Sequence, residues 1–295
     1  MKRVRKAVLP VAGLGTRVLP ATKSIPKEML PVFDRPAIQY VVDEAIAAGI
    51  EHFVFVTGRN KGAIEDYFDR SYELEATLQD KGKTEILENL SRTRAAPGSM
   101  SFVRQQAPLG LGHAIWCARD IIGDEPFAIL LPDVLVRAEP SCLAQMIAAY
   151  QDTGGNIIAV EQVAPADVDK YGVIDPLERQ GNRIRMRGMV EKPPVDKAPS
   201  KLAITGRDIL QGSIFKYLED QAAGAGGEIQ LTDAMARLMQ HQDFHAVEYA
   251  GQSYDCGDKL GYLRATISFA LNDPELGAAA RKVAETALKN EGAGN

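Results

Sequence analysis

The chain has 295 residues, a hydrophobic fraction of 45%, a charged fraction of 25% and a formal net charge of −5. The negative net charge argues against a nucleic-acid partner, and no apolar run approaches the ~18 residues that a membrane-spanning helix needs. The three cysteines are an odd number at wide spacing, which argues against a disulfide framework and favours a reducing compartment. We therefore expect a cytoplasmic protein with no nucleic-acid partner and no membrane contact.

Short apolar runs alternate with helical spacing through the first half of the chain. This alternation is typical of a mainly parallel sheet with helices on both of its faces. The predicted strands are residues 6–12, 52–57, 100–104 and 127–132, and the predicted helices are residues 38–48, 61–68 and 113–122.

The second half predicts a more mixed sheet, because several consecutive strands have no helix between them. The predicted strands are residues 156–163, 171–175, 183–190, 201–205 and 244–249, and the predicted helices are residues 207–220 and 229–241.

Two further segments are predicted to be helical. Residues 72–92 are charged and helix-prone without a strong apolar face, which fits a solvated excursion, with a lid or a subunit contact as the alternative. After Asp258 the pattern predicts helices at residues 263–271 and 276–288, which could pack on the body or on another subunit. The last five residues, 291–295, are expected to fray.

The first strand and the loop after it carry the strongest chemical signal. Gly13 and Gly15 would let backbone N–H groups approach a ligand closely, at a strand end where ligands bind in α/β sheets. Arg17 and Lys27, ten positions apart, supply positive charge for an anion. The dinucleotide-binding motif needs a third glycine where Val18 stands, and no run matches a Walker loop. The pattern predicts a nucleotide-phosphate site of another kind.

Two motifs carry a resemblance to a known family, namely Ala-Gly-Leu-Gly-Thr-Arg at residues 12–17 and Pro-Lys-Glu-Met-Leu-Pro at residues 26–31. They resemble the signature of the sugar-1-phosphate nucleotidyltransferases, and more narrowly of the bacterial branch that transfers uridylyl groups to glucose 1-phosphate. The resemblance covers about residues 5–270. Further matching segments follow in the family's order at residues 105–114, 131–133, 171–173, 191–193, 228–234 and 254–257.

The resemblance implies an α/β fold, a Rossmann-like three-layer αβα arrangement with a mixed, mainly parallel central sheet. It implies a nucleotidyltransferase domain at residues 1–272, with a nucleotide-binding part at about residues 1–135 and a sugar-binding part at about residues 136–257. Residues 273–295 would form a C-terminal helix and a frayed tail. The implied substrates are UTP and glucose 1-phosphate, the implied cofactor is Mg²⁺, and a homo-oligomer, dimer or tetramer, is expected.

The implied reaction is attack of a sugar-1-phosphate oxygen on the α-phosphorus of UTP, which needs positioning and electrostatic stabilisation rather than a protein nucleophile. By resemblance Arg17, Lys27 and Lys192 are the catalytic cations. A glutamine side chain can pair with a pyrimidine edge. His113, at the start of a predicted helix, is interpreted as structural. The nucleotide-binding residues implied by the resemblance are Ala12, Gly13, Gly15, Glu28, Gln105 and Gly110.

Asp133 ends a strand whose preceding residues are apolar, and a carboxylate at such a strand end is suited to Mg²⁺. Its expected partner is Asp255, far away in the sequence. Asp258 competes for this second role, although its place before a helical run favours an N-cap. His241 and His245 lie four residues apart but lack the glutamate of the metalloprotease motif, so we do not assign them a metal.

The sugar side is assigned to residues of the second half. By resemblance, Gly172 would place a backbone group against the hexose, and Glu191 would accept hydrogen bonds from sugar hydroxyls. Lys192 would hold the phosphate of glucose 1-phosphate and the transferred phosphoryl group, and Thr205 is a weaker candidate.

Three alternatives remain open at this point. A thymidylyltransferase on the same fold is the nearest, because uracil and thymine differ by one methyl group, which a pocket discriminates by only about 1–3 kcal/mol. A catalytically silent sugar-nucleotide sensor would not need the whole set of charged residues. A nicotinamide-dependent oxidoreductase is disfavoured because the third glycine is missing.

Overall fold

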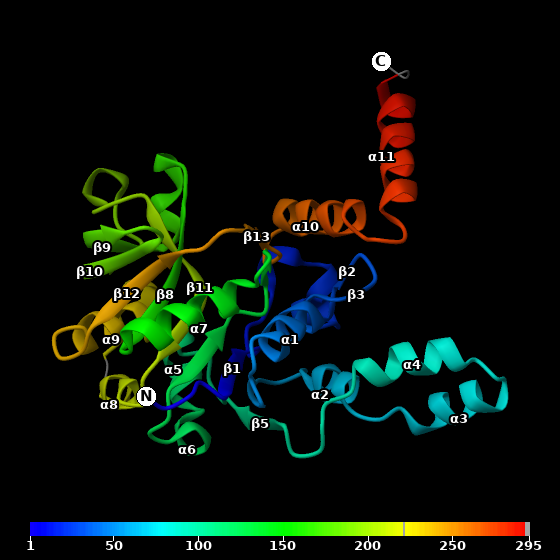
Figure 1. Ribbon diagram of the computed structural model, residues 1–295, viewed down its shortest axis with the longest axis horizontal. Coiled ribbons are helices and arrows are strands. Elements are labelled where there is room, and N and C mark those ends of the chain that lie inside the picture. Colours follow the sequence, from blue (N-terminus) through cyan, green and yellow to red (C-terminus); the bar gives the residue numbers. More distant parts are fainter. Residues whose placement is uncertain (221, 293–295) are drawn as a thin grey trace.

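The computed structural model describes residues 1–220 and 222–292, and these residues form a nine-stranded sheet with helices on both faces (Figure 1). The predicted frayed tail lies partly outside the described residues. In spatial order the strands are β5 (Met100–Arg104), β4 (His52–Thr57), β1 (Lys6–Pro10), β6 (Phe127–Leu130), β11 (Leu202–Leu210), β8 (Asn156–Gln162), β12 (Phe244–Glu248), β10 (Arg183–Glu191) and β9 (Gly172–Gln180).

The sheet has a parallel half and a mixed half. Strands β5, β4, β1 and β6 are parallel to one another, so that their carboxyl ends meet at one edge. Strand β11 is antiparallel to both of its neighbours, β6 and β8, and β10 is antiparallel to β12 and β9. The expected α/β fold with a mixed central sheet is confirmed, and its parallel order is concentrated in the first half.

The helices complete three layers around this sheet, with a hydrophobic core on each of its faces. One core contains α1, α2 and α7, and the other contains α5, α8 and α9. The helices are α1 (Ala37–Ala47), α2 (Gly62–Phe68), α3 (Tyr72–Asp80), α4 (Thr84–Arg92), α5 (Leu111–Trp116), α6 (Arg119–Ile122), α7 (Cys142–Thr153), α8 (Ile214–Glu219), α9 (Leu231–Leu238), α10 (Lys259–Leu271) and α11 (Gly277–Gly292).

Two short ribbons join segments outside the large sheet. Strand β2 (Pro31–Val32) pairs with β3 (Arg35–Pro36). Strand β7 (Val134–Arg137) pairs with β13 (Gln252–Asp255), in a register that sets Asp255 opposite Val134. The second ribbon therefore brings the late part of the chain to the end of β6.

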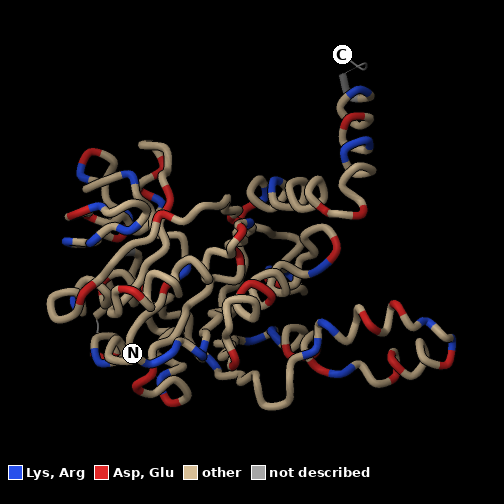
Figure 2. The backbone as a smooth tube through the Cα atoms, in the orientation of Figure 1, with Lys and Arg blue, Asp and Glu red and all other residues tan. Residues whose placement is uncertain are grey.

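Two helical segments project from the body (Figure 1). Residues 72–92 form the pair α3 and α4, which carries acidic and basic residues along both helices (Figure 2). The helical prediction for this segment is confirmed, and its role stays a prediction. The C-terminal helix α11 leaves the body beyond α10. No helix among residues 1–220 and 222–292 is long and apolar enough to cross a membrane.

Two secondary-structure predictions are wrong. Residues 207–220 are not one helix, because β11 continues through Leu210 and only Ile214–Glu219 is helical. Strand β11 lies between β6 and β8, and the pairing with both neighbours outweighs local helical spacing. The predicted helix at residues 113–122 is divided into α5 and α6.

Candidate active site

The ends of β1, β4 and β5 lie together at one edge of the sheet, where the sequence predicts that the base and the phosphates bind. The backbone N–H of Gln105, after β5, donates to the Thr57 carbonyl at the end of β4 over 2.8 Å. A Cβ atom added to Gly58 would lie 3.1 Å from the carbonyl oxygen of Ala12, after β1. The glycine loop and Gln105 therefore share one edge of the sheet.

The loop after β1 is open on one side and anchored on the other. A Cβ atom on Gly13 would meet no atom within 4 Å, which leaves room for a ligand. Gly15 has φ +66°, and its carbonyl accepts a hydrogen bond from the Thr22 hydroxyl at 2.7 Å. A Cβ atom on Gly15 would lie 3.3 Å from Cβ of Lys27. Glycine is favoured there by both the left-handed φ and the close approach of Lys27.

Two cations and two carboxylates converge beside this loop. Nζ of Lys27 lies 2.5 Å from Oδ2 of Asp133. The Arg17 guanidinium lies 3.3 Å from Oδ2 of Asp255 and 3.9 Å from Oδ2 of Asp133. A Cβ atom on Gly257 would lie 2.7 Å from Oδ1 of Asp255 and 2.9 Å from Oδ2 of Asp133, so both carboxylates border the same small space. The four charged residues thus form one cluster.

The ribbon of β7 and β13 builds this cluster from distant parts of the chain. The Cys256 N–H donates to the Asp133 carbonyl at 2.7 Å, directly after the ribbon ends. On β13, the Ser253 hydroxyl donates to the carboxylate of Glu161 at 2.7 Å, which ties the ribbon to β8. The positions of both candidate metal ligands are therefore fixed by backbone and side-chain bonds around them.

The two carboxylates have different electrostatic surroundings. Burial raises the pKa of Asp133, but the charge and hydrogen bond of Lys27 outweigh it and hold this pKa below its usual value. Burial and the negative charge of Asp133 raise the pKa of Asp255 above its usual value. A cation between the two groups would relieve this repulsion.

The donor set fits a magnesium ion that is also held by substrate. Mg²⁺ is commonly bound through one or two carboxylates together with substrate phosphates and water. Asp133 and Asp255 supply two such carboxylates, and no larger group of His, Cys, Asp or Glu occurs among the described residues. Asp258 is the N-cap of α10, where its carboxylate accepts from the backbone N–H groups of Leu260 and Gly261 at 2.9 and 2.8 Å. The geometry favours Asp255 over Asp258.

Arg207, from the mixed half, supports the segment that carries Asp133. Its side chain is fully buried and pairs with Glu44 at 2.9 Å. The same guanidinium donates to the carbonyls of Leu131 and Val134 at 3.1 and 2.8 Å, on either side of Asp133. Strand β11 therefore helps to fix the loop in which Asp133 lies.

The side chain of Gln105 is oriented by two acceptors. Its Nε2 lies 3.1 Å from the Gly110 carbonyl oxygen and 3.1 Å from Nδ1 of His113. Gly110 has φ +106°, and a Cβ atom there would come within 2.7 Å of the Glu228 side chain and 2.9 Å of the Ile229 nitrogen. Gly110 therefore has a packing role in addition to its carbonyl contact.

Glu28 does not face the open side of the site. Its side chain is 0% exposed, and Oε2 accepts a hydrogen bond from Nζ of Lys61 at 2.8 Å. Oε1 has no hydrogen-bond partner among residues 1–220 and 222–292. Burial raises the pKa of Glu28 despite the charges of Lys61 and Lys27. Glu28 therefore ties its segment to Lys61, the N-cap residue of α2.

The sugar-side candidates meet where β9, β10 and α9 approach one another. Oε2 of Glu191 accepts a hydrogen bond from the Thr232 hydroxyl at 2.7 Å. A Cβ atom on Gly172 would lie 3.1 Å from both of these oxygens. Nζ of Lys192 lies 3.5 Å from Oε1 of Glu191, and Lys192 has φ +46°. The backbone N–H of Lys192 donates to the Tyr171 carbonyl at 3.0 Å.

The two sides of the site lie within electrostatic range of each other. Burial and the negative charges of Asp255 and Glu161 raise the pKa of Tyr171, whose carbonyl accepts a hydrogen bond from the Lys192 N–H.

Thr205 is placed differently from the other sugar-side candidates, because its hydroxyl is buried and donates to the Ala159 carbonyl at 3.2 Å within the sheet. The hydroxyl proton of Thr205 is therefore engaged within the sheet and is not available to a sugar.

The comparisons with known proteins agree with this geometry. The family model described as nucleotidyl transferase matches residues 6–270. The chain belongs to the nucleotidyl transferase family. It is 52% identical over 276 residues to the UTP–glucose-1-phosphate uridylyltransferase of Bacillus subtilis strain 168, covering 94% of each chain. It is 49% identical to the protein of that name from Staphylococcus epidermidis, covering 94% of this chain and 96% of the relative.

Solved structures of nucleotidyl transferases extend the likeness to the fold. A UTP-bound UGPase from Acinetobacter baumannii matches with a TM-score of 0.88 and 47% identity, covering 95% of this chain and 98% of that one. A putative glucose-1-phosphate thymidylyltransferase from Bacillus anthracis matches with a TM-score of 0.72 at 20% identity, covering 92% of this chain and 96% of that one, which shows a shared fold alone.

Sequence reasoning missed several residues of this nucleotidyl transferase that hold the candidate groups in place. Thr232 lies in a segment that carried the resemblance, but the segment alone indicates only the start of a helix. Lys61 begins a predicted helix, and its pairing with Glu28 has no local signal. Arg207 and Glu44 are 163 positions apart, so only the sheet order brings them together.

Proposed function

We propose that this nucleotidyl transferase moves a uridylyl group from UTP to glucose 1-phosphate and gives UDP-glucose and pyrophosphate. The convergence of Asp133 and Asp255 with Arg17 and Lys27 beside the glycine loop carries this proposal. Curated relatives that share about half of the sequence bear the name of this activity, and one solved relative is described as UTP-bound.

The nucleotide side would bind UTP mainly through the backbone and cations. The loop at Ala12, Gly13 and Gly15 would present N–H groups to the triphosphate. Arg17 would neutralise the β- and γ-phosphates that leave, and Lys27 would stabilise charge at the α-phosphate. The uracil edge would face Gln105 and the Gly110 backbone, while the buried Glu28 would support the loop.

Magnesium would be held by Asp133 and Asp255. Its chemistry would be to neutralise negative charge on the phosphates as that charge grows during transfer. The residues of the chain would bind the two substrates and align them. Lys27, already beside Asp133, would remain next to the reacting phosphate.

The sugar side would align the attacking oxygen. Glu191 would accept hydrogen bonds from hexose hydroxyls, and the Gly172 backbone would border the ring. Lys192 would hold the phosphate of glucose 1-phosphate, and its backbone is left-handed where the strand ends. Attack on the α-phosphorus of UTP then forms the new P–O bond as the bond to pyrophosphate breaks.

A pyrophosphate-release assay tests the activity. UTP and dTTP are crossed with several hexose 1-phosphates in the presence of Mg²⁺, and the highest kcat/KM is expected for UTP with glucose 1-phosphate. Preference for dTTP would make the chain a thymidylyltransferase. Binding without pyrophosphate release for any pair would make it a sugar-nucleotide sensor.

The metal assignment is tested by substitution of single carboxylates. Asp133→Asn is expected to weaken the apparent Mg²⁺ affinity by at least about 10- to 100-fold, because the loss of a group that only supports a metal ligand already has this effect. Asp255→Asn should act in the same direction, whereas Asp258→Asn is a matched control because asparagine also caps a helix. Magnesium titrations of pyrophosphate release measure all three variants. An unchanged titration in Asp133→Asn would move the metal elsewhere.

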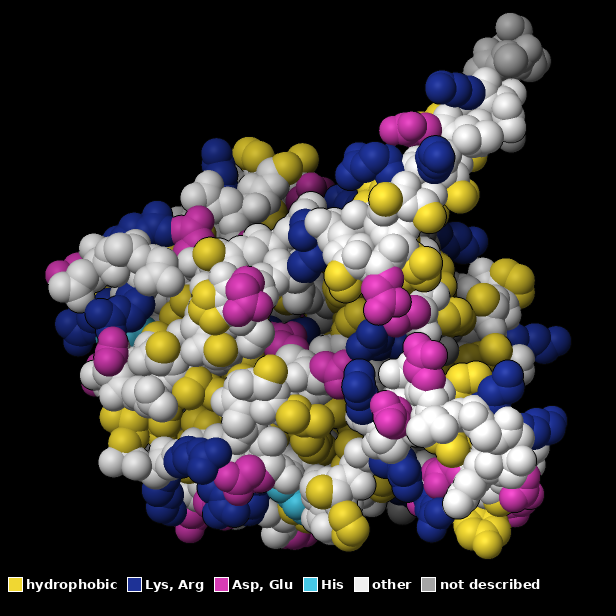
Figure 3. Space-filling model, turned by 45° about the vertical axis from the view of Figure 1, so that its right-hand side comes forward, with side chains coloured by type: hydrophobic (Ala, Val, Ile, Leu, Met, Phe, Trp, Pro, Cys, Tyr) yellow, Lys and Arg dark blue, Asp and Glu magenta, His cyan; other side chains and the backbone are white. Residues whose placement is uncertain are grey.

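We further propose that the enzyme works in the cytoplasm as a homo-oligomer, a dimer or a tetramer. The three cysteines are unpaired, which fits a reducing compartment. Hydrophobic side chains are exposed around the base of the projecting C-terminal helix (Figure 3), and such surfaces commonly bind another chain. The exposed large hydrophobic residues of α10, α11 and the segment between them include Leu263, Ile267, Leu276, Val283 and Leu288. Sedimentation of the purified chain would test the oligomeric state.

A further inference from the structure

The amide of Gln105 has one orientation that satisfies its surroundings. The Gly110 carbonyl can only accept a hydrogen bond, so the NH₂ group of Gln105 must face it. The second acceptor of this NH₂ group is Nδ1 of His113 at 3.1 Å. The amide oxygen of Gln105 accepts no hydrogen bond from the described part of the chain and is not buried. It is left available to a ligand.

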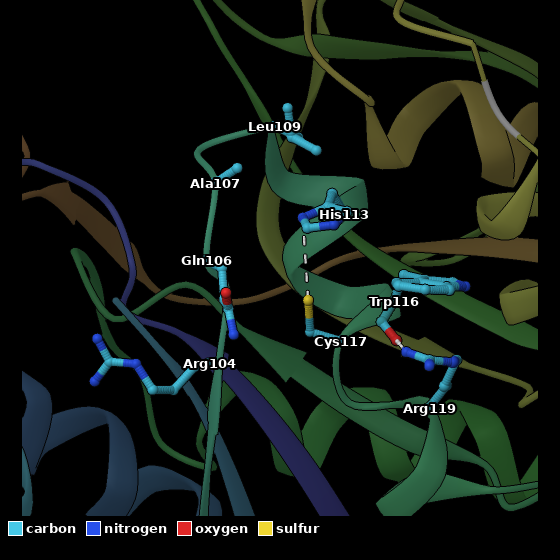
Figure 4. A pocket seen from close by; sticks show the side chains of 8 residues that line it. All are labelled: Arg104, Gln106, Ala107, Leu109, His113, Trp116, Cys117 and Arg119. Atoms are coloured by element: carbon cyan, nitrogen blue, oxygen red, sulfur yellow. Dashed lines mark hydrogen bonds between the residues drawn. The ribbon is translucent and has the colours of Figure 1, made fainter. Parts of the chain in front are cut away.

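The imidazole of His113 is itself held in place. Its ring stacks on Trp116 with centroids 5.9 Å apart and an interplanar angle of 25°. Burial and the positive charge of Arg119 lower the pKa of His113, which keeps the ring neutral and able to accept at Nδ1. The Cys117 sulfur, 4.0 Å from Nδ1, is a weak second neighbour (Figure 4). The ring therefore acts as a fixed acceptor.

We propose that His113 is a positioning residue that, together with the Gly110 carbonyl, locks the Gln105 amide and so makes the site select bases with an N3–H donor. The inference rests on the proposed placement of the base beside Gln105. Uracil presents N3–H, which the amide oxygen can accept. Cytosine presents an unprotonated N3, which would face the same oxygen as a second acceptor. A free amide could rotate and donate to cytosine, whereas a locked amide cannot.

The surroundings of His113 permit substitution without loss of the fold. The ring borders a cavity of about 330 Å³, which is lined also by Arg104, Trp116 and Arg119 but not by Gln105 (Figure 4). His113 is partly exposed and lies outside the two hydrophobic cores. A ring of similar size, such as phenylalanine, removes the acceptor and keeps the shape. Asparagine retains an acceptor near the position of Nδ1.

Calorimetric binding of UTP and CTP to the full chain tests the inference. His113→Phe is expected to lower the UTP-over-CTP affinity ratio about tenfold, the upper range for one neutral hydrogen bond. His113→Asn should restore most of the ratio. In a Gln105→Ala background, His113→Phe should change the ratio no further, because the group that it orients is gone.

The outcomes separate this inference from the proposed activity. An unchanged ratio in His113→Phe, or the same change with and without Gln105, would overturn the role of His113. Wild-type chain that prefers UTP but releases no pyrophosphate with glucose 1-phosphate would contradict the proposed reaction and leave the role of His113 supported. Equal affinity of the wild-type chain for UTP and CTP would show that the site does not select bases with an N3–H donor.

Discussion

The parallel and mixed halves of the sheet contribute to the site in different ways. In the parallel half, candidate groups lie in loops directly after β1, β5 and β6, so the strand ends alone bring Gly13, Gln105 and Asp133 to one edge. In the mixed half, Glu191 and Lys192 lie at the end of an antiparallel strand and depend on bonds to Thr232 and Tyr171. The first arrangement follows from topology, and the second from individual hydrogen bonds of the backbone and of side chains.

Removal of the buried ion pair between Arg207 and Glu44, which lies where the two halves of the sheet meet, is expected to have the largest effect. Arg207→Ala should lower the free energy of unfolding by about 3–5 kcal/mol, because it leaves the buried Glu44 carboxylate unpaired. It also removes the donors to the Leu131 and Val134 carbonyls. Urea unfolding measures the change. Arg185→Ala, an exposed arginine on β10 that lies 3.8 Å from Asp243, is the surface control and should change little.

A small loss in Arg207→Ala, below about 1 kcal/mol, would mean that Glu44 regains water or another donor. The two halves would then be joined by backbone pairing between β6 and β11 rather than by the buried ion pair.

Lys192→Ala should impair the proposed role of the mixed half and leave that of the parallel half intact. We expect kcat to fall by about 10²–10³-fold, the usual cost of losing one preorganised charged group at the reacting centre. The affinity for UTP should remain, because the proposed nucleotide contacts lie in the parallel half. Lys197→Ala, an exposed lysine in the following loop, is the matched control. Turnover near wild type in Lys192→Ala would remove this lysine from the mechanism.

The sequence predicted the parallel half more completely than the mixed half for a physical reason. In a parallel sheet, strand ends determine where loops meet, so apolar runs and glycines locate Gly13 and Asp133 without knowledge of distant contacts. The boundaries of β4 and β5 were predicted to the residue. Asp255 could be proposed only through the resemblance, since the β7–β13 ribbon that brings it to Asp133 has no periodic signal.

The mixed half was harder to predict because its order depends on pairing between distant strands. Strand β11 includes residues 207–210, which the sequence pattern predicted to be helical. The Thr205 hydroxyl, predicted to face the sugar, donates to a carbonyl within the sheet. The support of Glu191 by Thr232 spans 41 positions and has no local pattern. Local sequence identified the candidate groups there, but not what orients them.

Asp208, next to Arg207 on β11, has a buried carboxyl group that should make the free energy of unfolding depend on pH. Burial raises the pKa of Asp208 to about 7, and Oδ1 has no hydrogen-bond partner in the described chain. Since the folded-state pKa exceeds the unfolded value of about 3.9, the folded state binds the proton more tightly. The free energy of unfolding should therefore fall as the pH rises from about 4 to about 7.

Asp208→Asn should remove this component of the pH dependence. The neutral amide avoids ionisation, so the variant should exceed the wild type in stability at pH 8 by on the order of 2–3 kcal/mol and approach it near pH 4. Urea unfolding at several pH values measures the difference. Parallel curves for the two proteins would show that Asp208 does not cause the pH dependence.

Thr232→Val gives the smallest effect and tests the difference between the halves most directly. Valine keeps the shape but removes the hydroxyl that donates to Oε2 of Glu191. A hydrogen bond to a charged group contributes about 1.5–3 kcal/mol. Because Thr232 only orients Glu191, part of this is lost in substrate binding, and KM for glucose 1-phosphate should rise about fivefold. The affinity for UTP should not change, and Thr232→Ser should remain near wild type.

Equal weakening of both substrates in Thr232→Val would mean that α9 supports the whole site rather than its sugar side. This result would be explained by Ile229, just before α9, which bonds to Leu109 and Gly112 beside the proposed base-binding segment. The hydroxyl of Thr232, however, bonds to Glu191 and not to that segment. Selective loss of glucose 1-phosphate affinity would therefore show that a single side-chain bond orients Glu191 in the mixed half, whereas the parallel half relies on strand order.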